Sequence, residues 1–219
     1  MFHDSSRQRG PATVTEWMAA GVLATIIFSF FVADIAENYT PIKLSALLVL
    51  LFWIPLLVTH ECGHALAAYL LDWYVGQVVI GMGRVLGRFR AGTASVEIRA
   101  IPTQGFVRSV PKNLNQPQLR SALIYFAGPG MDLAFAGMVL MVIGPDKLFT
   151  IADDYGSIVW QSLALAAAAQ GILNLLPMSV GTEQGDIASD GLGIIRSLMR
   201  PDRYYAAMIG QTFDERERD

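Results

Sequence analysis

Four long apolar segments dominate the pattern of hydrophobic and polar residues along the chain. They cover roughly residues 17–33, 43–71, 122–143 and 158–176. A helix needs about 20 mostly apolar residues to cross a bilayer. The pattern therefore predicts an α-helical polytopic membrane protein with about four transmembrane helices. The first segment could be a signal peptide, but its apolar part exceeds the usual ~7–15 residues and no A-x-A cleavage site stands out, so we expect a retained anchor.

A different pattern occupies residues 73–110, where glycines recur among β-branched residues and apolar and polar positions alternate over short stretches. This predicts two to four short strands with glycine turns, forming a small membrane-associated β segment on the cytoplasmic side. We divide the chain into a polar N-terminus (1–16), an intramembrane domain (17–198) and a charged C-terminal tail (199–219). The end of that tail, residues 211–219, is expected to be disordered.

The charges of the loops predict the orientation. Residues 72–120 carry seven Lys and Arg against two acidic residues, whereas the other two loops carry few basic residues. Because positive charge marks the cytoplasmic side, both termini are expected in the cytoplasm. The predicted location is a multi-pass integral membrane protein of a bacterial plasma (inner) membrane.

Composition indicates which surroundings and binding partners to expect. Of 219 residues, 53% are hydrophobic and 16% are charged, compared with about 25% charged in soluble domains, and the net charge is -3. The lipid bilayer is therefore the expected surrounding, and no basic field indicates nucleic acid. The single cysteine, Cys62, excludes an intrachain disulfide and a thiolate-cluster metal site.

Three ionisable residues interrupt the second apolar segment. His60 and His64 are four apart and therefore share one face of a helix, where two imidazoles can bind one Zn²⁺. Glu61 lies next to the first histidine and can serve as general base toward water, the pattern known as H-E-x-x-H. Ionisable groups inside a span are costly and usually functional. The alternatives are a polar cluster that bonds neighbouring helices, or a membrane helix that ends before His60 and leaves the motif in water.

Two histidines leave a catalytic zinc site one ligand short. Such sites commonly use two His and one carboxylate, with an open fourth position. No other histidine lies nearby, and Cys62 faces another side of the helix. Among the acidic residues that follow the fourth apolar segment, the candidates are Asp186 and Asp190.

Several motifs together resemble the site-2 protease family of intramembrane zinc metalloproteases (the M50 type). They are THECGHALAA, IGMGRVLGRF with IRAIPTQGFVR, AGPGMD, and NLLP followed by SDG, and they span residues 58–198. The chain would be a compact member without a PDZ domain. Three features depart from the family pattern: a long stretch separates Pro177 from Asp190, Asp132 stands where Asn is common, and Gln104 stands where Gly is usual.

The resemblance implies residue roles. His60, His64 and Asp190 would bind zinc; Asp190 is favoured over Asp186 because Gly191 follows it. Glu61 would be the general base and later the proton donor, and Asn174 would hold the substrate backbone. The alternative for Asp190 is an ordinary helix N-cap, and for Asn174 a helix-helix hydrogen bond.

The implied activity is hydrolysis of a peptide bond in or near a transmembrane segment, as in regulated intramembrane proteolysis. The expected substrate is a single-pass membrane protein whose helix opens locally, or which pairs as a strand with the β segment. A catalytically inactive zinc-binding protein, a metal transporter or a scaffold is the rival interpretation. Glu61 favours the protease, because hydrolysis needs a base beside the metal and transport does not.

Overall fold

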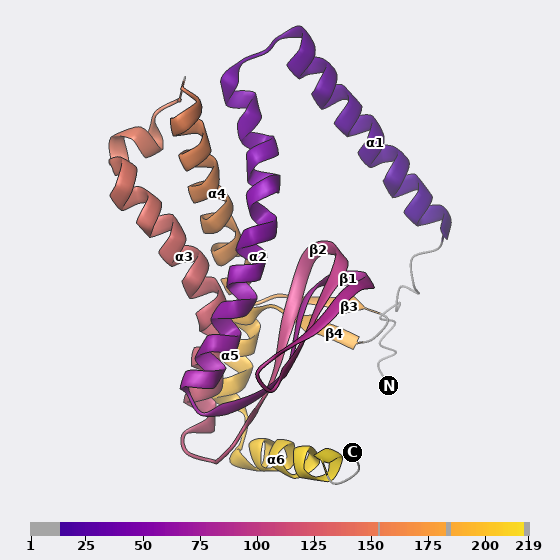
Figure 1. Ribbon diagram of the computed structural model, residues 1–219, viewed down its shortest axis with the longest axis vertical. Coiled ribbons are helices and arrows are strands. Elements are labelled where there is room, and N and C mark those ends of the chain that lie inside the picture. Colours follow the sequence, from indigo (N-terminus) through magenta and orange to yellow (C-terminus); the bar gives the residue numbers. More distant parts are fainter. Residues whose placement is uncertain (1–13, 153, 183–184, 217–219) are drawn as a thin grey trace, which may run out of the picture.

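The computed structural model describes residues 14–152, 154–182 and 185–216. In chain order its elements are α1 (Val14–Glu37), the 3-10 turn η1 (Pro41–Lys43), α2 (Leu44–Leu70), β1 (Trp73–Ala91), β2 (Ala94–Pro111), α3 (Pro117–Phe149), α4 (Tyr155–Leu175), β3 (Ser179–Thr182), β4 (Gly185–Ala188), α5 (Asp190–Met199) and α6 (Asp202–Arg216). Helices α2, α3 and α4 pack against one another, and the remaining elements other than α1 and η1 gather around their lower halves (Figure 1). The fold is mostly helical, as predicted.

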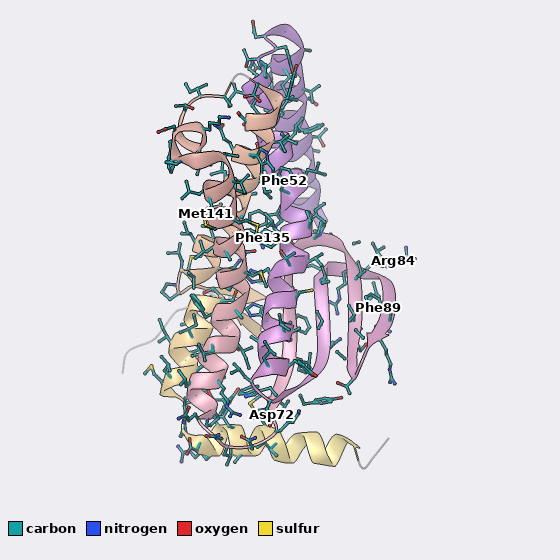
Figure 2. The ribbon with its side chains drawn as sticks, turned by 60° about the vertical axis from the view of Figure 1, so that its left-hand side comes forward. Phe52, Asp72, Arg84, Phe89, Phe135 and Met141 are labelled. Carbon is teal, nitrogen blue, oxygen red and sulfur yellow. The ribbon has the colours of Figure 1, made fainter. Side chains whose placement is uncertain are left out.

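Among the described residues, three helices are long and apolar enough to cross a membrane: Pro41–Leu70, Pro117–Phe149 and Tyr155–Leu175. They coincide with the second, third and fourth predicted segments. Their outward side chains are apolar; Leu50 is 67% exposed and Met141 80%, and Figure 2 shows Met141 pointing away from the bundle. Such a surface suits lipid. Helix α1, which contains the first predicted segment, diverges from the bundle in Figure 1, and some of its side chains lie outside the described part. Whether this segment spans the membrane therefore stays a prediction.

Small side chains let the three helices approach closely. Ala166 and Ala167 of α4 are fully buried with Leu56 of α2, and Phe52 and Phe135 pack around them. Figure 2 shows these two aromatic side chains in the same layer between α2 and α3. On α2, Leu56 and Phe52 of this cluster lie four and eight residues before His60.

The β1–β2 hairpin is folded back on itself. Residues 73–80 pair with 105–111 on one side and, from 77 onward, with 95–98 on the other, while 85–91 pair with 94–99. Two long strands therefore make four adjacent segments. The bend passes through Gly81 and Gly83, whose φ angles of 92° and 77° favour glycine. Figure 2 shows Arg84 and Phe89 on the part of the hairpin far from the helices.

The C-terminal region corrects one expectation. The end of the tail was predicted to be disordered, yet α6 continues to Arg216. Tyr205 is 1% exposed; its ring makes an edge contact with Trp73, and its hydroxyl donates to the Ser197 carbonyl at 3.0 Å. These contacts dock α6 against the start of the hairpin. The charged composition concealed an aromatic anchor earlier in the same segment.

Candidate metal centre and active site

The two histidines meet on the face of α2 that packs against α3. Their ring centroids are 4.8 Å apart, and their Nε2 atoms are 3.2 Å apart. His60, Glu61 and His64 are at most 6% exposed. The helix continues through all three residues to Leu70, so the alternative in which it ends before His60 is wrong.

Asp190, the first residue of α5, completes the group. Its Oδ2 lies 3.0 Å from His60 Nε2, and its Oδ1 lies 3.3 Å from His64 Nε2. Three such ligand atoms, all within 4.8 Å of one another, could hold a metal ion. The side chain of the other candidate, Asp186, lies outside the described part of the chain.

The hydrogen bonds made by Nδ1 of each imidazole determine that Nε2 faces Asp190. His60 Nδ1 lies 2.6 Å from Asp132 Oδ2, and His64 Nδ1 lies 2.6 Å from the Ile124 carbonyl oxygen. Both partners are acceptors, so each Nδ1 carries the hydrogen. In neutral imidazoles the two Nε2 atoms then present lone pairs toward each other and toward Asp190. Lone pairs crowded in this way fit a cation between them.

The spacing of these donors also fits zinc. Zinc–nitrogen and zinc–oxygen bonds of about 2.0–2.2 Å at tetrahedral angles place neighbouring ligand atoms roughly 3.3–3.6 Å apart. The two Nε2 atoms are 3.2 Å apart, His60 Nε2 lies 3.0 Å from Asp190 Oδ2, and His64 Nε2 lies 3.3 Å from Asp190 Oδ1, close to this spacing. Two His and one carboxylate, with room for a fourth ligand, is a catalytic donor set.

Glycine provides the space for this cluster. A Cβ at Gly128 of α3 would lie 2.4 Å from His64 Nε2 and 2.7 Å from His60 Nε2. On the α2 side of the same contact, a Cβ at Gly63 would lie 2.7 Å from the Ala127 carbonyl oxygen. The AGPG stretch therefore lets the backbone of α3 approach the two imidazoles directly.

Glu61 lies between α2 and the hairpin. A Cβ at Gly105 of β2 would lie 2.6 Å from Glu61 Oε1, so the strand passes directly over the carboxylate. Glu61 Oε2 is buried and has no hydrogen-bond partner among the described residues. A buried carboxylate oxygen without a protein partner is available to a water molecule or a substrate.

The hydrogen bonds of Ser189 explain how Asp190 reaches the two histidines despite the long stretch after Pro177. The strands β3 (Ser179–Thr182) and β4 (Gly185–Ala188) pair as a short hairpin in that stretch. At its base the Ser189 hydroxyl donates to the Leu176 carbonyl at 2.6 Å and accepts from the Met178 and Leu192 amides. The N-cap of α5 is therefore Ser189, and the interpretation of Asp190 as an ordinary N-cap is wrong.

A cavity of about 710 Å³ contains the cluster. Its lining includes His60, Glu61 and Asp190, and it extends to Arg196 and Tyr204 of α5 and α6. Asn174 lines it too, with its side-chain amide donating to the Gln170 carbonyl at 3.0 Å. The predicted site residues thus come together in one cavity, which reaches the elements below the membrane-spanning bundle.

Sequence reasoning missed two members of this site. Asp132 was noted only as a departure from a family pattern, and Gln170 was not singled out. Gln170 Nε2 donates to both oxygens of Asp132, at 3.2 and 3.3 Å. The available signal was their polarity inside apolar spans, which by itself marks a functional candidate.

Comparison with known proteins supplies the family. A sequence profile of peptidase family M50 matches residues 46–149. A protein of Arabidopsis thaliana named "Probable membrane metalloprotease ARASP2, chloroplastic" is 27% identical over 164 residues, which cover 66% of this chain and 37% of that protein. The zinc metalloprotease Rip1 of Mycobacterium tuberculosis is 29% identical over 112 residues, covering 43% of this chain and 28% of Rip1.

The membrane metalloprotease ARASP of Arabidopsis thaliana is 32% identical over 100 residues, covering 40% of this chain and 22% of that protein. The chain spans about a third or less of the length of these curated relatives. The profile match includes the H-E-x-x-H helix, the hairpin and α3. This confirms the predicted resemblance to peptidase family M50.

Proposed function

We propose that this protein is an intramembrane zinc metalloendopeptidase. The observation that carries the proposal is the convergence of His60, His64 and Asp190 on one point, beside a buried glutamate with an unpartnered oxygen. His60, His64 and Asp190 hold the zinc ion. When bound, zinc supplies Lewis-acid chemistry that polarises a carbonyl and lowers the pKa of water.

Glu61 moves the proton. Its carboxylate takes a proton from the attacking water as the new carbon–oxygen bond forms, and gives it to the leaving amine as the carbon–nitrogen bond breaks. Its burial between α2 and Gly105 keeps it beside the reacting carbonyl. Asn174, on the wall of the same cavity, is the proposed contact to the substrate backbone.

The edge of the hairpin supports a mode of substrate binding. In the described sheet, residues 105–111 pair only with residues 73–80, so the other edge of this segment is available for an added strand. Gly105 begins that segment and lies against Glu61. A single-pass membrane protein that unwinds locally presents its carbonyl here, and regulated intramembrane proteolysis is the matching process.

The loop charges support the orientation. The seven Lys and Arg residues of segment 72–120 lie on the cytoplasmic side, with both termini, in a bacterial inner membrane. The cavity extends toward this side through α5 and α6, which gives water a path to Glu61. The oligomeric state is left open.

The test combines metal content with hydrolysis in detergent. The substrate is a panel of fluorogenic single-pass transmembrane peptides, half of them carrying a Gly-Pro pair that weakens the helix. We expect near one zinc per chain, activity abolished by a chelator and restored by zinc, and loss of zinc in Asp190→Ala. Glu61→Gln should keep zinc and lose at least ~100-fold in rate. Zinc binding with equal hydrolysis by Glu61→Gln would contradict the proposal, and zinc binding without any hydrolysis would favour an inactive zinc-binding protein.

A further inference from the structure

Asp132 is a carboxylate in the interior of a membrane-spanning helix. It lies in α3, outside the H-E-x-x-H motif and outside the three proposed ligands, and it is 0% exposed. Burying a charge in a span is unfavourable unless the charge is paired. A carboxylate buried inside a span therefore needs hydrogen-bonding partners.

Two helices supply partners for Asp132. His60 of α2 donates from Nδ1 to Oδ2 at 2.6 Å, and Gln170 of α4 donates from Nε2 to both oxygens. A Cβ at Gly171 would lie 3.0 Å from Leu133 Cγ and 3.1 Å from the Pro129 carbonyl oxygen. The missing side chain at Gly171 therefore lets α4 come close enough for Gln170 to reach Asp132.

The side-chain amide of Gln170 is turned so that it donates to Asp132. A carboxylate only accepts hydrogen bonds, and the amide turns its NH₂ group toward it. Gln170 Oε1 is consequently buried with no partner among the described residues. Leaving a buried acceptor unsatisfied is unfavourable, so the two bonds donated to Asp132 are the contacts that hold Gln170 in this orientation.

We propose that Asp132, held by Gln170, is a positioning residue for the metal centre. It fixes the ring of His60 with Nε2 toward His64 and Asp190, and it makes His60 a stronger ligand by accepting from Nδ1. This inference rests on the proposed zinc site.

The experiment measures zinc affinity of the full chain in detergent, by competition with a chromophoric chelator. Asp132→Asn keeps an acceptor for His60 and removes the charge; the Gln170 amide can rotate to satisfy the new NH₂ group. Gln170→Ala removes the support without touching a ligand. The matched control is Ser162→Ala, another buried polar residue of α4, which bonds only within its own helix, to the Ile158 carbonyl.

We expect zinc affinity to fall about 10- to 100-fold in Asp132→Asn, which is typical for the loss of a partner behind a metal ligand. Gln170→Ala should weaken it in the same direction, by a smaller factor. Ser162→Ala should stay within about twofold of the wild type. The d–d absorption of the Co²⁺-loaded protein should change in Asp132→Asn and stay unchanged in the control, a readout that a purely structural role would not move.

The outcomes separate the two proposals. A wild-type protein that binds no zinc would overturn the proposed function and this inference together. Wild-type zinc binding with unchanged affinity and an unchanged Co²⁺ spectrum in Asp132→Asn would overturn the inference alone and make Asp132 a link between helices. If Asp132→Asn does not purify with a cooperative unfolding transition, Gln170→Ala decides: an affinity equal to that of the control would overturn the proposal.

Discussion

A single methyl group at Gly128 should disable the metal centre. In Gly128→Ala the new Cβ would lie 2.4 Å from His64 Nε2, 2.6 Å from His64 Cε1 and 2.7 Å from His60 Nε2. Carbon atoms reach their best contact at about 3.5–4.0 Å, so the imidazoles or the helix must move by about 1 Å. Zinc sites tolerate bond-length changes of only about 0.2 Å.

The size of the effect follows from the number of ligands. Structural zinc sites with four ligands bind with about 10–16 kcal/mol in total, or roughly 3 kcal/mol per ligand on average. Loss of one histidine contact should then cost about two powers of ten in affinity, at about 1.4 kcal/mol per factor of ten. Because the added methyl faces both Nε2 atoms, the loss in Gly128→Ala should be at least ~100-fold.

The assay is zinc competition on detergent-purified protein, with thermal unfolding measured in parallel. Gly137→Ala is the matched control: it lies on the same helix, and a Cβ there would meet nothing within 4 Å. We expect the control to bind zinc like the wild type. Wild-type zinc affinity in Gly128→Ala would refute the placement of the metal between these two nitrogens and Asp190.

Three further predictions test other parts of the structure. Ser189→Ala removes the N-cap of α5 and two loop contacts, so stability should fall by about 1 kcal/mol or more and zinc should bind more weakly through Asp190; an unchanged melting temperature would contradict this. Tyr205→Ala should release α6, seen as new protease cleavage after residue 200, at a cost of about 3–5 kcal/mol; cleavage equal to the wild type would argue against docking. A hydrogen bond from Arg99 lowers the pKa of Glu97, with burial opposing this and Arg88 adding to it. The stability that Glu97 contributes to the fold is therefore present above its ordinary pKa and lost as the pH falls through the lowered value. Glu97→Gln should flatten the acid side of the curve of stability against pH, and an unchanged curve would exclude a contribution from Glu97.

Local spacing made half of the site predictable. His60, Glu61 and His64 form one turn of one helix, so their relative positions follow from helix geometry alone. Asp190 lies 126 residues beyond His64, and no periodicity connects the two. Its place depended on a resemblance to known motifs, and in the structure it depends on the Ser189 contacts at the base of the β3–β4 hairpin.

The fold shows the same division between local and distant contacts. The apolar segments gave α2, α3 and α4, because length and hydropathy are local properties. The double pairing of residues 77–80 in the folded hairpin could not be foreseen, because alternation reveals a strand and leaves its partners open. The C-terminal helix was missed because the contact between Tyr205 and Trp73 joins residues 132 positions apart.

In the proposed protease, the position of Glu61 limits the directions from which a substrate can approach. One side of this carboxylate is covered by Gly105, and Phe52 and Phe135 pack in an apolar cluster between the helices. The cavity continues in the other direction, toward Arg196 and Tyr204. In the proposed orientation, entry of water and an unwound substrate segment from that side would place cleavage near the cytoplasmic end of the substrate helix, where few backbone hydrogen bonds need to be broken. Moving the Gly-Pro pair along the fluorogenic peptides tests this directly: the fastest cleavage should occur with the pair near the cytoplasmic end, and equal cleavage with the pair at the bilayer centre would show that the substrate reaches Glu61 laterally, between the helices.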